Sequence, residues 1–121
     1  MPRAVICREL GTPDMLAFEE VPSAPLARGQ VRVAIHAACV NFPDILMVAG
    51  KYQHKPPLPF TPGVEAAGVI SELDPDAHGF TVGDRVIVRL LPGAYAEEAV
   101  VHNQATWQQF IVLVVDPLRA E

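Results

Sequence analysis

The stretch "PFTPGVEAAGV", Pro59–Val69, runs from a proline-stiffened loop into a carboxylate and then into nearly side-chain-free residues. The segment "EAAGVISEL", residues 65–73, is predicted to be a strand. Its small residues Ala66, Ala67 and Gly68 let another backbone pass close, as happens where strands cross in a small barrel. The run is therefore interpreted as a packing device within a β fold.

Short strands joined by stiff turns are predicted on both sides of this stretch. Twelve prolines in 121 residues are about twice the usual proline content of ~5%, and they lie between apolar segments rather than inside them. A half-buried strand begins at Val31, because Val31, Val33, Ile35 and Ala37 alternate with Arg32, Ala34 and His36. The other predicted strands cover residues 3–10, 16–21, 81–90 and 92–101, the first two as a possible hairpin.

One short helix interrupts this β pattern at "FPDILMVAG", residues 42–50. Pro43 lies near its first turn and Gly50 lies where it would end, which is the usual asymmetry of a short helix. Asn41 is placed to cap its N-terminus.

Composition excludes several classes of protein. The length suits one domain, and the formal charge of −5 argues against a nucleic-acid partner. The longest apolar run, "FIVLVV" at 110–115, is much shorter than the roughly 20 residues of a membrane helix. Cys7 and Cys39 have no metal-type spacing, and the N-terminus lacks the apolar core of a signal peptide. We therefore expect a cytoplasmic location with both thiols free and no membrane partner.

Common catalytic motifs are missing from the sequence. No glycines have the G-x-G-x-x-G spacing, and Gly63 and Gly68 match the outer glycines of a P-loop only with Val69 in place of its lysine. No histidine pair or cysteine pair has the spacing of zinc ligands, so no metal is expected.

Polar residues flank the rigid loop: Asn41, Asp44, Tyr52 and Glu65. Each has a purely structural interpretation. Asn41 caps the helix, and Asp44 is a first-turn acid favoured by the helix dipole. Tyr52 is a surface aromatic, and Glu65 holds neighbouring segments together by hydrogen bonds.

Several ordered motifs resemble one family: the segment from Arg3 to Ile70, then "GFTVGDRVIV", then "GAYAEEAVV". The chain is similar to the medium-chain dehydrogenase/reductase family, and most of all to its zinc-free quinone oxidoreductases, which reduce quinones or enones with NADPH. The resemblance implies a mainly β, GroES-like barrel with one or two short helices over residues 1–101. It also implies a divergent tail over residues 102–121, with the family's Rossmann domain absent from this sequence.

The resemblance also implies a site. In zinc-dependent relatives a cysteine stands where Asn41 stands, and a histidine stands where Val64 stands, before a glutamate that matches Glu65. Two metal-binding positions are therefore lost, and no zinc is expected. Asn41 and Tyr52 match the residues that lie near the nicotinamide, so both are expected to be catalytic and cofactor-binding. A second tyrosine of the family is Leu46 here.

Three roles remain open for the chain. It is the substrate-side domain of an NADPH-dependent quinone or enone reductase, incomplete as a catalyst without a nucleotide domain. Alternatively, it is a non-enzymatic barrel module that associates with full-length relatives, or it is a remnant without function. Because a barrel without the second domain exposes apolar surface, a homo-oligomer is also expected. "FIVLVV" is expected either to add a strand or to aggregate. The final segment of the sequence is interpreted as an alternative end, a frameshifted end or the end of a truncated product.

Overall fold

The computed structural model describes residues 1–104 and 109–114. Strands make up most of its regular structure, and the described residues contain one α-helix. In chain order the elements are β1 (Arg3–Cys7), the 3-10 turn η1 (Pro13–Met15), β2 (Leu16–Glu20), β3 (Gln30–Ala38), α1 (Phe42–Val48), β4 (Glu65–Leu73), β5 (Arg85–Arg89), β6 (Glu98–His102) and β7 (Phe110–Leu113).

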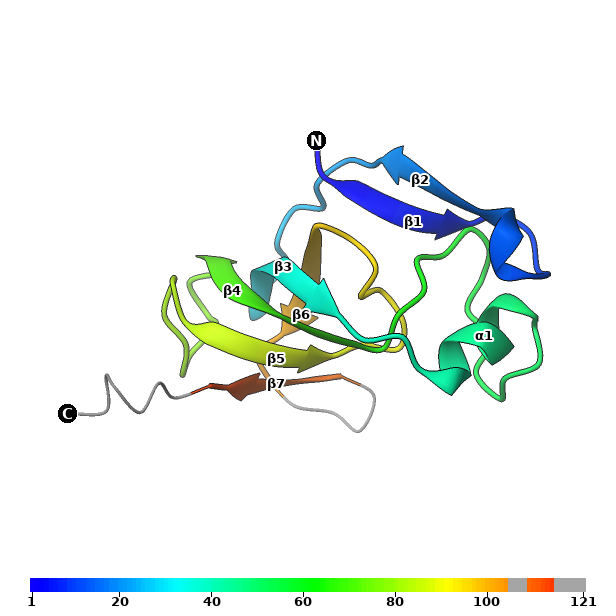
Figure 1. The fold of residues 1–121 in the computed structure, drawn as a ribbon. Coiled ribbons are helices and arrows are strands. Elements are labelled where there is room, and N and C mark those ends of the chain that lie inside the picture. The colour runs from blue at the N-terminus through cyan, green and yellow to red at the C-terminus, as the bar shows by residue number, and fades with distance from the viewer. Residues whose placement is uncertain (105–108, 115–121) are drawn as a thin grey trace.

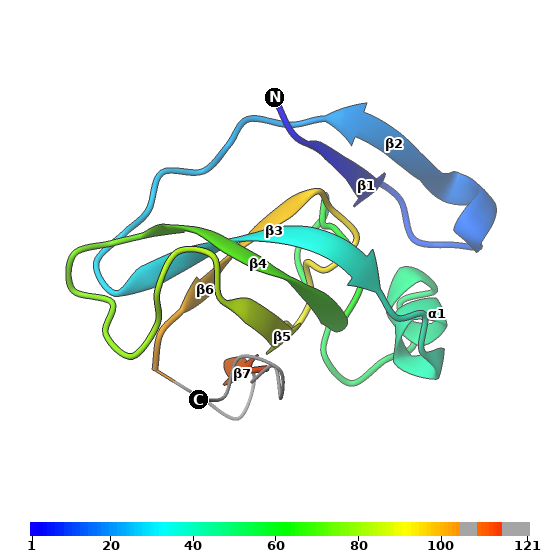
Figure 2. The ribbon, with the colours of Figure 1, turned by 60° about the vertical axis from the view of Figure 1, so that its left-hand side comes forward.

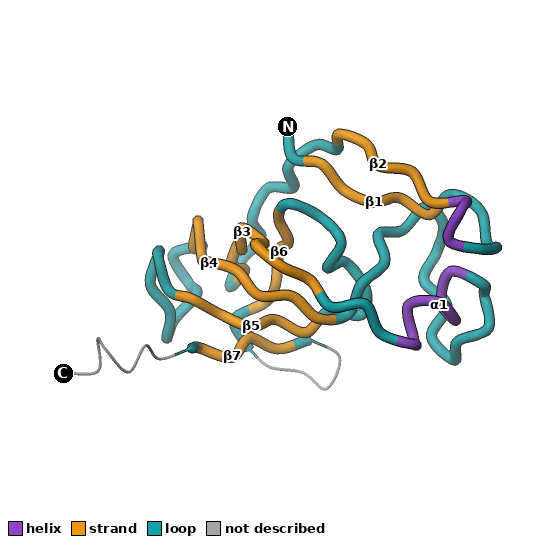
Figure 3. The backbone as a smooth tube through the Cα atoms, viewed as in Figure 1, coloured by secondary structure: helices purple, strands orange, loops and turns teal. Residues whose placement is uncertain are grey.

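The strands form two antiparallel sheets. β1 and β2 pair as the predicted hairpin, while the larger sheet has the order β6-β3-β4-β5-β7. The larger sheet curls into a half-barrel, and the hairpin lies across one side of it with its η1 end near α1 (Figures 1 and 2). Long loops link α1 to β4 and β5 to β6 (Figure 3). The predicted mainly β, barrel-type fold is confirmed.

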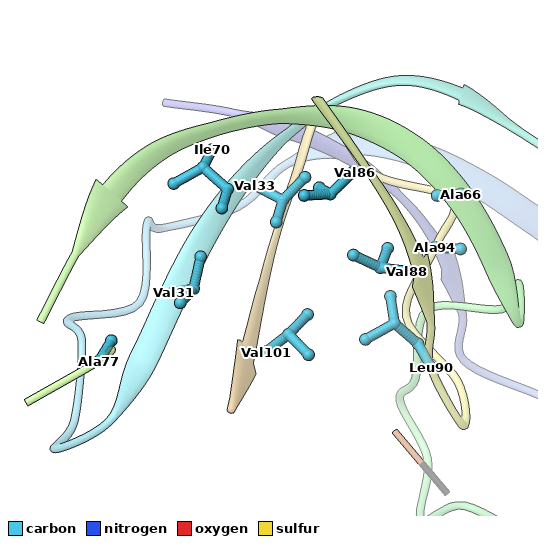
Figure 4. Close-up of a cluster of buried hydrophobic side chains, with 10 residues drawn as sticks. All are labelled: Val31, Val33, Ala66, Ile70, Ala77, Val86, Val88, Leu90, Ala94 and Val101. Atoms are coloured by element: carbon cyan, nitrogen blue, oxygen red, sulfur yellow. The ribbon is translucent and has the colours of Figure 1, made fainter. Parts of the chain in front are cut away.

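Inward-facing side chains of the curled sheet form the main core (Figure 4). On β3, Val31 and Val33 are fully buried, as their alternation predicts, but Ala37 on the same strand is exposed. The pairing of β3 with β4 shifts register between Ile35 and Ala37. The shift ends the strict alternation of the strand, because an extra residue turns the following side chains to the other face. The core cluster comprises Val31, Val33, Ala66, Ile70, Ala77, Val86, Val88, Leu90, Ala94 and Val101.

Gly68 lies at the closest approach of β3 and β4. A Cβ atom built on Gly68 would lie 2.1 Å from the carbonyl oxygen of Ala34 and 3.0 Å from a methyl group of Val33. The first distance is far below any real carbon–oxygen contact, so only glycine fits at this position. The interpretation of the small-residue run as a packing device is confirmed at Gly68.

The predicted strand over residues 92–101 forms only from Glu98 onward, as β6. The N–H groups of Gly93 and Ala94 donate instead to the carbonyl oxygen of Gly63, at 2.9 and 3.1 Å. These bonds tie the β5–β6 loop to the loop before β4. The first half of the segment is thereby used to join two loops and not to extend a strand.

The apolar run near the end of the sequence contributes β7. Residues 110–113 pair with β5, so Val86 lies opposite Leu113 and Arg89 lies opposite Phe110. Of the two outcomes expected for this run, addition of a strand is confirmed. Residues 105–108 and 115–121 of the expected tail lie outside the described residues, and the domain boundary after residue 101 stays a prediction. In the described part of the chain, no helix has the length and apolar character needed to cross a membrane.

Candidate functional site

Asn41 lies at the N-terminus of α1, where the sequence places it. Its φ and ψ of −122° and 160° are extended, so the helix begins at the next residue, with Pro43 in the first turn. The backbone N–H of Asn41 donates to Oδ2 of Asp44 at 2.7 Å. Asp44 thus accepts a hydrogen bond from a backbone group that the helix itself leaves without a partner.

Asp44 is the centre of the site. It is only 3% exposed, and among the described residues it is the one charged residue in the buried class. Its Oδ2 atom also accepts a hydrogen bond of 2.8 Å from the hydroxyl of Tyr95, which lies 3.1 Å from the carbonyl oxygen of Cys39 as well. The structural interpretation of Asp44 as a first-turn acid is therefore incomplete, because the carboxylate also joins α1 to the distant β5–β6 loop.

Gly63 lets Tyr95 reach this position. Its φ of +100° is a conformation that side-chain-bearing residues rarely adopt, and a Cβ atom there would lie 2.6 Å from the Tyr95 ring and 2.8 Å from the Cβ of Ala94. The N–H of Tyr95 donates to the carbonyl oxygen of Pro62, and its own carbonyl oxygen accepts from the N–H of Val5. Pro62 and Gly63, just before β4, therefore hold Tyr95 in place, because Pro62 accepts a hydrogen bond from its N–H and Gly63 leaves room for its ring.

Two buried polar atoms at this site have no hydrogen-bond partner among the residues that the structure describes: Nδ2 of Asn41 and Oδ1 of Asp44. Buried donors and acceptors are nearly always paired, and an unpaired one costs about 1–3 kcal/mol. The Asn41 amide therefore retains a donor with no partner among the described residues, which a bound acceptor could reach only after a small opening of the site.

An apolar cavity of about 220 Å³ adjoins this cluster, between η1 and α1. Val40 and Ile45, which contribute to its wall, are also among the exposed large apolar side chains, as is Phe42 at 70% exposure. The start of α1 therefore combines a buried polar cluster with exposed apolar side chains beside it. The wall of the cavity includes Leu16, Val40, Asp44, Ile45, Pro62 and Tyr95.

Among the described residues, the side chains of Tyr52 and Glu65 form no hydrogen bond with Asn41, Asp44 or Tyr95. Tyr52 is half-buried in the loop after α1, and in the described ranges no hydrogen bond joins it to Asn41. Glu65 begins β4, where its carboxylate lies 3.8 Å from the guanidinium of Arg89 and its carbonyl oxygen accepts from the N–H of Cys39 at 3.1 Å. The structure thus brings Asn41 and Asp44 together and leaves Tyr52 outside their hydrogen-bond network.

Titratable side chains do not form a metal-binding group within residues 1–104 and 109–114, where no three of His, Cys, Asp and Glu converge. Cys7 is buried, Cys39 is exposed, and both are free, as predicted. Burial raises the pKa of the Cys7 thiol, which disfavours its reactive thiolate form.

Tyr95 is the residue of this site that sequence reasoning missed. It stood in the motif "GAYAEEAVV", but no pattern marked it as a partner of Asp44, which lies 51 positions earlier. The Asn-x-x-Asp spacing at 41–44 is a capping signal and does announce the contact between those two residues. A signal for Tyr95 would have required knowledge of how the loops cross.

The pKa of Tyr95 lies well above the usual value of about 10, because burial disfavours the phenolate, and both the hydrogen bond to Asp44 and its charge add to this effect. The unfolded tyrosine ionises near pH 10 while the folded one keeps its proton. The folded state then binds more protons, so we expect the free energy of unfolding to fall as pH rises above about 10, by at most about 1.4 kcal/mol per pH unit.

Urea unfolding between pH 9 and pH 11.5 measures this effect. Above about pH 10, the Tyr52→Phe variant should lose stability as the parent does, because it keeps the Tyr95 phenol. The Tyr95→Phe variant should lose less stability over the same pH range, because it has no phenol at this position. Identical pH profiles for the two variants would contradict the assignment.

Comparison with known proteins assigns this fold to a family. The model described as the alcohol dehydrogenase GroES-like domain matches residues 27–111. Quinone oxidoreductase-like protein 2 of Mus musculus is 42% identical over 106 residues, which are 88% of this chain and 30% of that protein. Its homolog in Nematostella vectensis is 43% identical over 107 residues, which are 88% of this chain and 29% of that protein.

A crystal structure of Escherichia coli quinone oxidoreductase complexed with NADPH has the same fold. It is 29% identical, with a TM-score of 0.76, and the match covers 81% of this chain and 30% of that one. The chain therefore belongs to the alcohol dehydrogenase GroES-like domain family. Its similarity to quinone oxidoreductases confirms the predicted resemblance to that branch of the medium-chain dehydrogenases/reductases, and the chain spans about 30% of the length of these relatives.

Proposed function

We propose that this chain forms the substrate side of a zinc-independent, NADPH-dependent quinone or enone reductase. The observation that carries the proposal is the buried, unpartnered Nδ2 donor of Asn41 at the start of α1. An amide donor fits the carbonyl oxygen of a quinone or enone, or the carboxamide of a nicotinamide. The relatives named above support the reaction class, since they are quinone oxidoreductases.

The chain's own residues would bind the quinone or enone and orient it for hydride transfer. Asn41 would donate a hydrogen bond to the acceptor, and the exposed apolar side chains of Val40 and Phe42 beside it would exclude water from a flat ring. Tyr52 is proposed to contact the same ligand from the loop after α1. NADPH, when bound, supplies the hydride, so the protein needs to provide position and hydrogen bonds.

Zinc independence rests on the side chains at two positions. Asn41 and Val64 stand where zinc-dependent relatives have a cysteine and a histidine, and neither an amide nor an isopropyl group replaces a zinc ligand. A quinone is already electron-poor, so its carbonyl needs no metal to accept hydride. The two free thiols are consistent with the proposed cytoplasmic setting.

The test joins this chain to the remaining part of the mouse relative, which supplies what the chain does not span. We expect NADPH-dependent reduction of 1,4-benzoquinone that EDTA does not change. The Asn41→Ala variant of the chimera should lose about 10- to 100-fold in kcat/KM, the order expected for one lost hydrogen-bond donor. Asn103→Ala, the same change at the other asparagine of the chain, should keep full activity.

The assignment fails if the chimera folds and binds NADPH but reduces neither a quinone nor an enone. Loss of activity in EDTA with recovery on adding zinc would overturn the zinc-independent part alone. The isolated chain is expected to bind NADPH weakly or not at all in a direct titration. The alternative of a non-enzymatic interaction module is not favoured, because the relatives named above are oxidoreductases.

A further inference from the structure

Two polar groups converge on the side chain of Asp44, and one of them is the backbone N–H of Asn41. Oδ2 accepts hydrogen bonds from the N–H of Asn41 at 2.7 Å and from the hydroxyl of Tyr95 at 2.8 Å. The carboxylate is almost completely buried, so water cannot replace either donor without opening the site. The position of the Asn41 backbone is therefore coupled to the position of the Tyr95 ring.

The Tyr95 ring is itself held from several sides. The ring lies against Gly63, its N–H is bonded to Pro62, and its carbonyl oxygen is bonded to Val5 of β1. Its hydroxyl spans the end of β3 and the start of α1, through Cys39 and Asp44. These contacts fix the position of Tyr95, and its hydrogen bond to Asp44 positions the start of α1.

The Asn41 side chain is linked to Tyr95 through the capping box that it forms with Asp44, while its Nδ2 atom has no hydrogen-bond partner among the described residues. Backbone torsions set where an asparagine side chain points, and those of Asn41 are set by the bond to Asp44. A loss of that bond would allow the helix N-terminus to fray and the amide to turn toward solvent.

We propose that Asp44 and Tyr95 are positioning residues that hold the Asn41 amide in the orientation the ligand site requires. The inference rests on the proposed function, in which the Asn41 amide contacts the ligand. A merely structural role for the pair would predict lower stability in a variant but the same surroundings for the Asn41 amide in the fraction that stays folded.

The test observes the amide directly. The chain has only two asparagines, Asn41 and Asn103, so selective 15N-asparagine labelling yields two side-chain NH2 signals, which the Asn103→Ala variant assigns. In Tyr95→Phe we expect the Asn41 signal to move toward that of a free asparagine and to exchange with solvent at least about 10-fold faster. The Asn103 signal should stay in place.

Two controls separate positioning from general destabilisation. Tyr52→Phe removes the other tyrosine hydroxyl of the chain and should leave the Asn41 signal unchanged. Val101→Ala weakens the fully buried core on β6 and should leave it unchanged as well. If Tyr95→Phe does not fold, Asp44→Asn, which retains the shape of the carboxylate and adds a third asparagine signal of its own, should shift the Asn41 signal in the same direction by a smaller amount.

The proposal is overturned if the Asn41 signal of Tyr95→Phe coincides with that of the parent. It is also overturned if Val101→Ala shifts that signal as far, since the effect would then follow stability. No quinone or nucleotide is present in these samples, so an inactive chimera would refute the proposed function and leave this result standing. A static Asn41 signal in an active chimera would refute only the positioning role.

Discussion

Replacement of Gly68 by alanine is expected to lower the free energy of unfolding by about 3 kcal/mol or more, and to abolish cooperative folding if the parent has less than that to lose. The added Cβ atom would lie 2.1 Å from the carbonyl oxygen of Ala34. That oxygen belongs to the backbone of β3, so relief of the clash requires β3 and β4 to separate. The two strands are neighbours at the centre of the five-stranded sheet.

Urea unfolding followed by far-UV circular dichroism measures this loss, with Gly11→Ala as the matched control. The same methyl group at Gly11 would meet only the flexible side chain of Met15, at 3.1 Å. We expect that control to remain within about 0.5 kcal/mol of the parent. A Gly68→Ala variant as stable as the Gly11→Ala variant would show that β3 and β4 do not approach as closely as described.

Truncation of Asp44 to alanine is expected to cost about 1–3 kcal/mol of stability. Two opposing effects decide whether the variant is less or more stable than the parent. Removal of a buried carboxylate recovers its desolvation cost, which includes the unpartnered Oδ1 atom. Removal also leaves the N–H of Asn41 and the hydroxyl of Tyr95 without their shared acceptor. The Tyr95 hydroxyl still has the carbonyl oxygen of Cys39 at 3.1 Å, so the Asn41 N–H is the donor left without an acceptor, and its loss at about 1–3 kcal/mol outweighs the recovered term.

The control for this variant is Asp14→Ala, because Asp14 is an exposed acid of the η1 turn. Its removal should change stability by no more than about 0.5 kcal/mol. The same urea titration measures both variants at pH 7. An Asp44→Ala chain at least as stable as the parent would mean that desolvation of the carboxylate exceeds the value of its two hydrogen bonds.

Local sequence patterns predicted most of the fold. The alternation that begins at Val31, the prolines at the strand ends and the Asn41–Asp44 spacing each depend on neighbours within a few residues. The β1–β2 hairpin and α1 therefore appeared where they were expected. Segment boundaries were less predictable: residues 92–97 have strand-like composition, but the N–H groups of Gly93, Ala94 and Tyr95 bond to the carbonyl oxygens of residues 62 and 63.

The candidate site was predictable only in part, because its members come from separate segments. Asn41 was expected at the start of α1 and is there. Tyr52, placed beside it by resemblance alone, shares no hydrogen bond with it within the described residues. Tyr95 lies 51 positions beyond Asp44, a separation at which no periodicity of strands or helices carries information.

Whereas the GroES-like barrel followed from resemblance to a family, the sequence by itself determined that this chain is rich in strands and that the run Ala66, Ala67 and Gly68 allows a close backbone contact. These properties follow from residue size, alternation and backbone freedom, which act between near neighbours. The tertiary structure decided that Asp44 is buried, that Tyr95 is its partner and that an amide donor at Asn41 is left unpaired. Burial and pairing depend on which distant segments meet, because a hydrogen bond gains its strength from the exclusion of water by those segments.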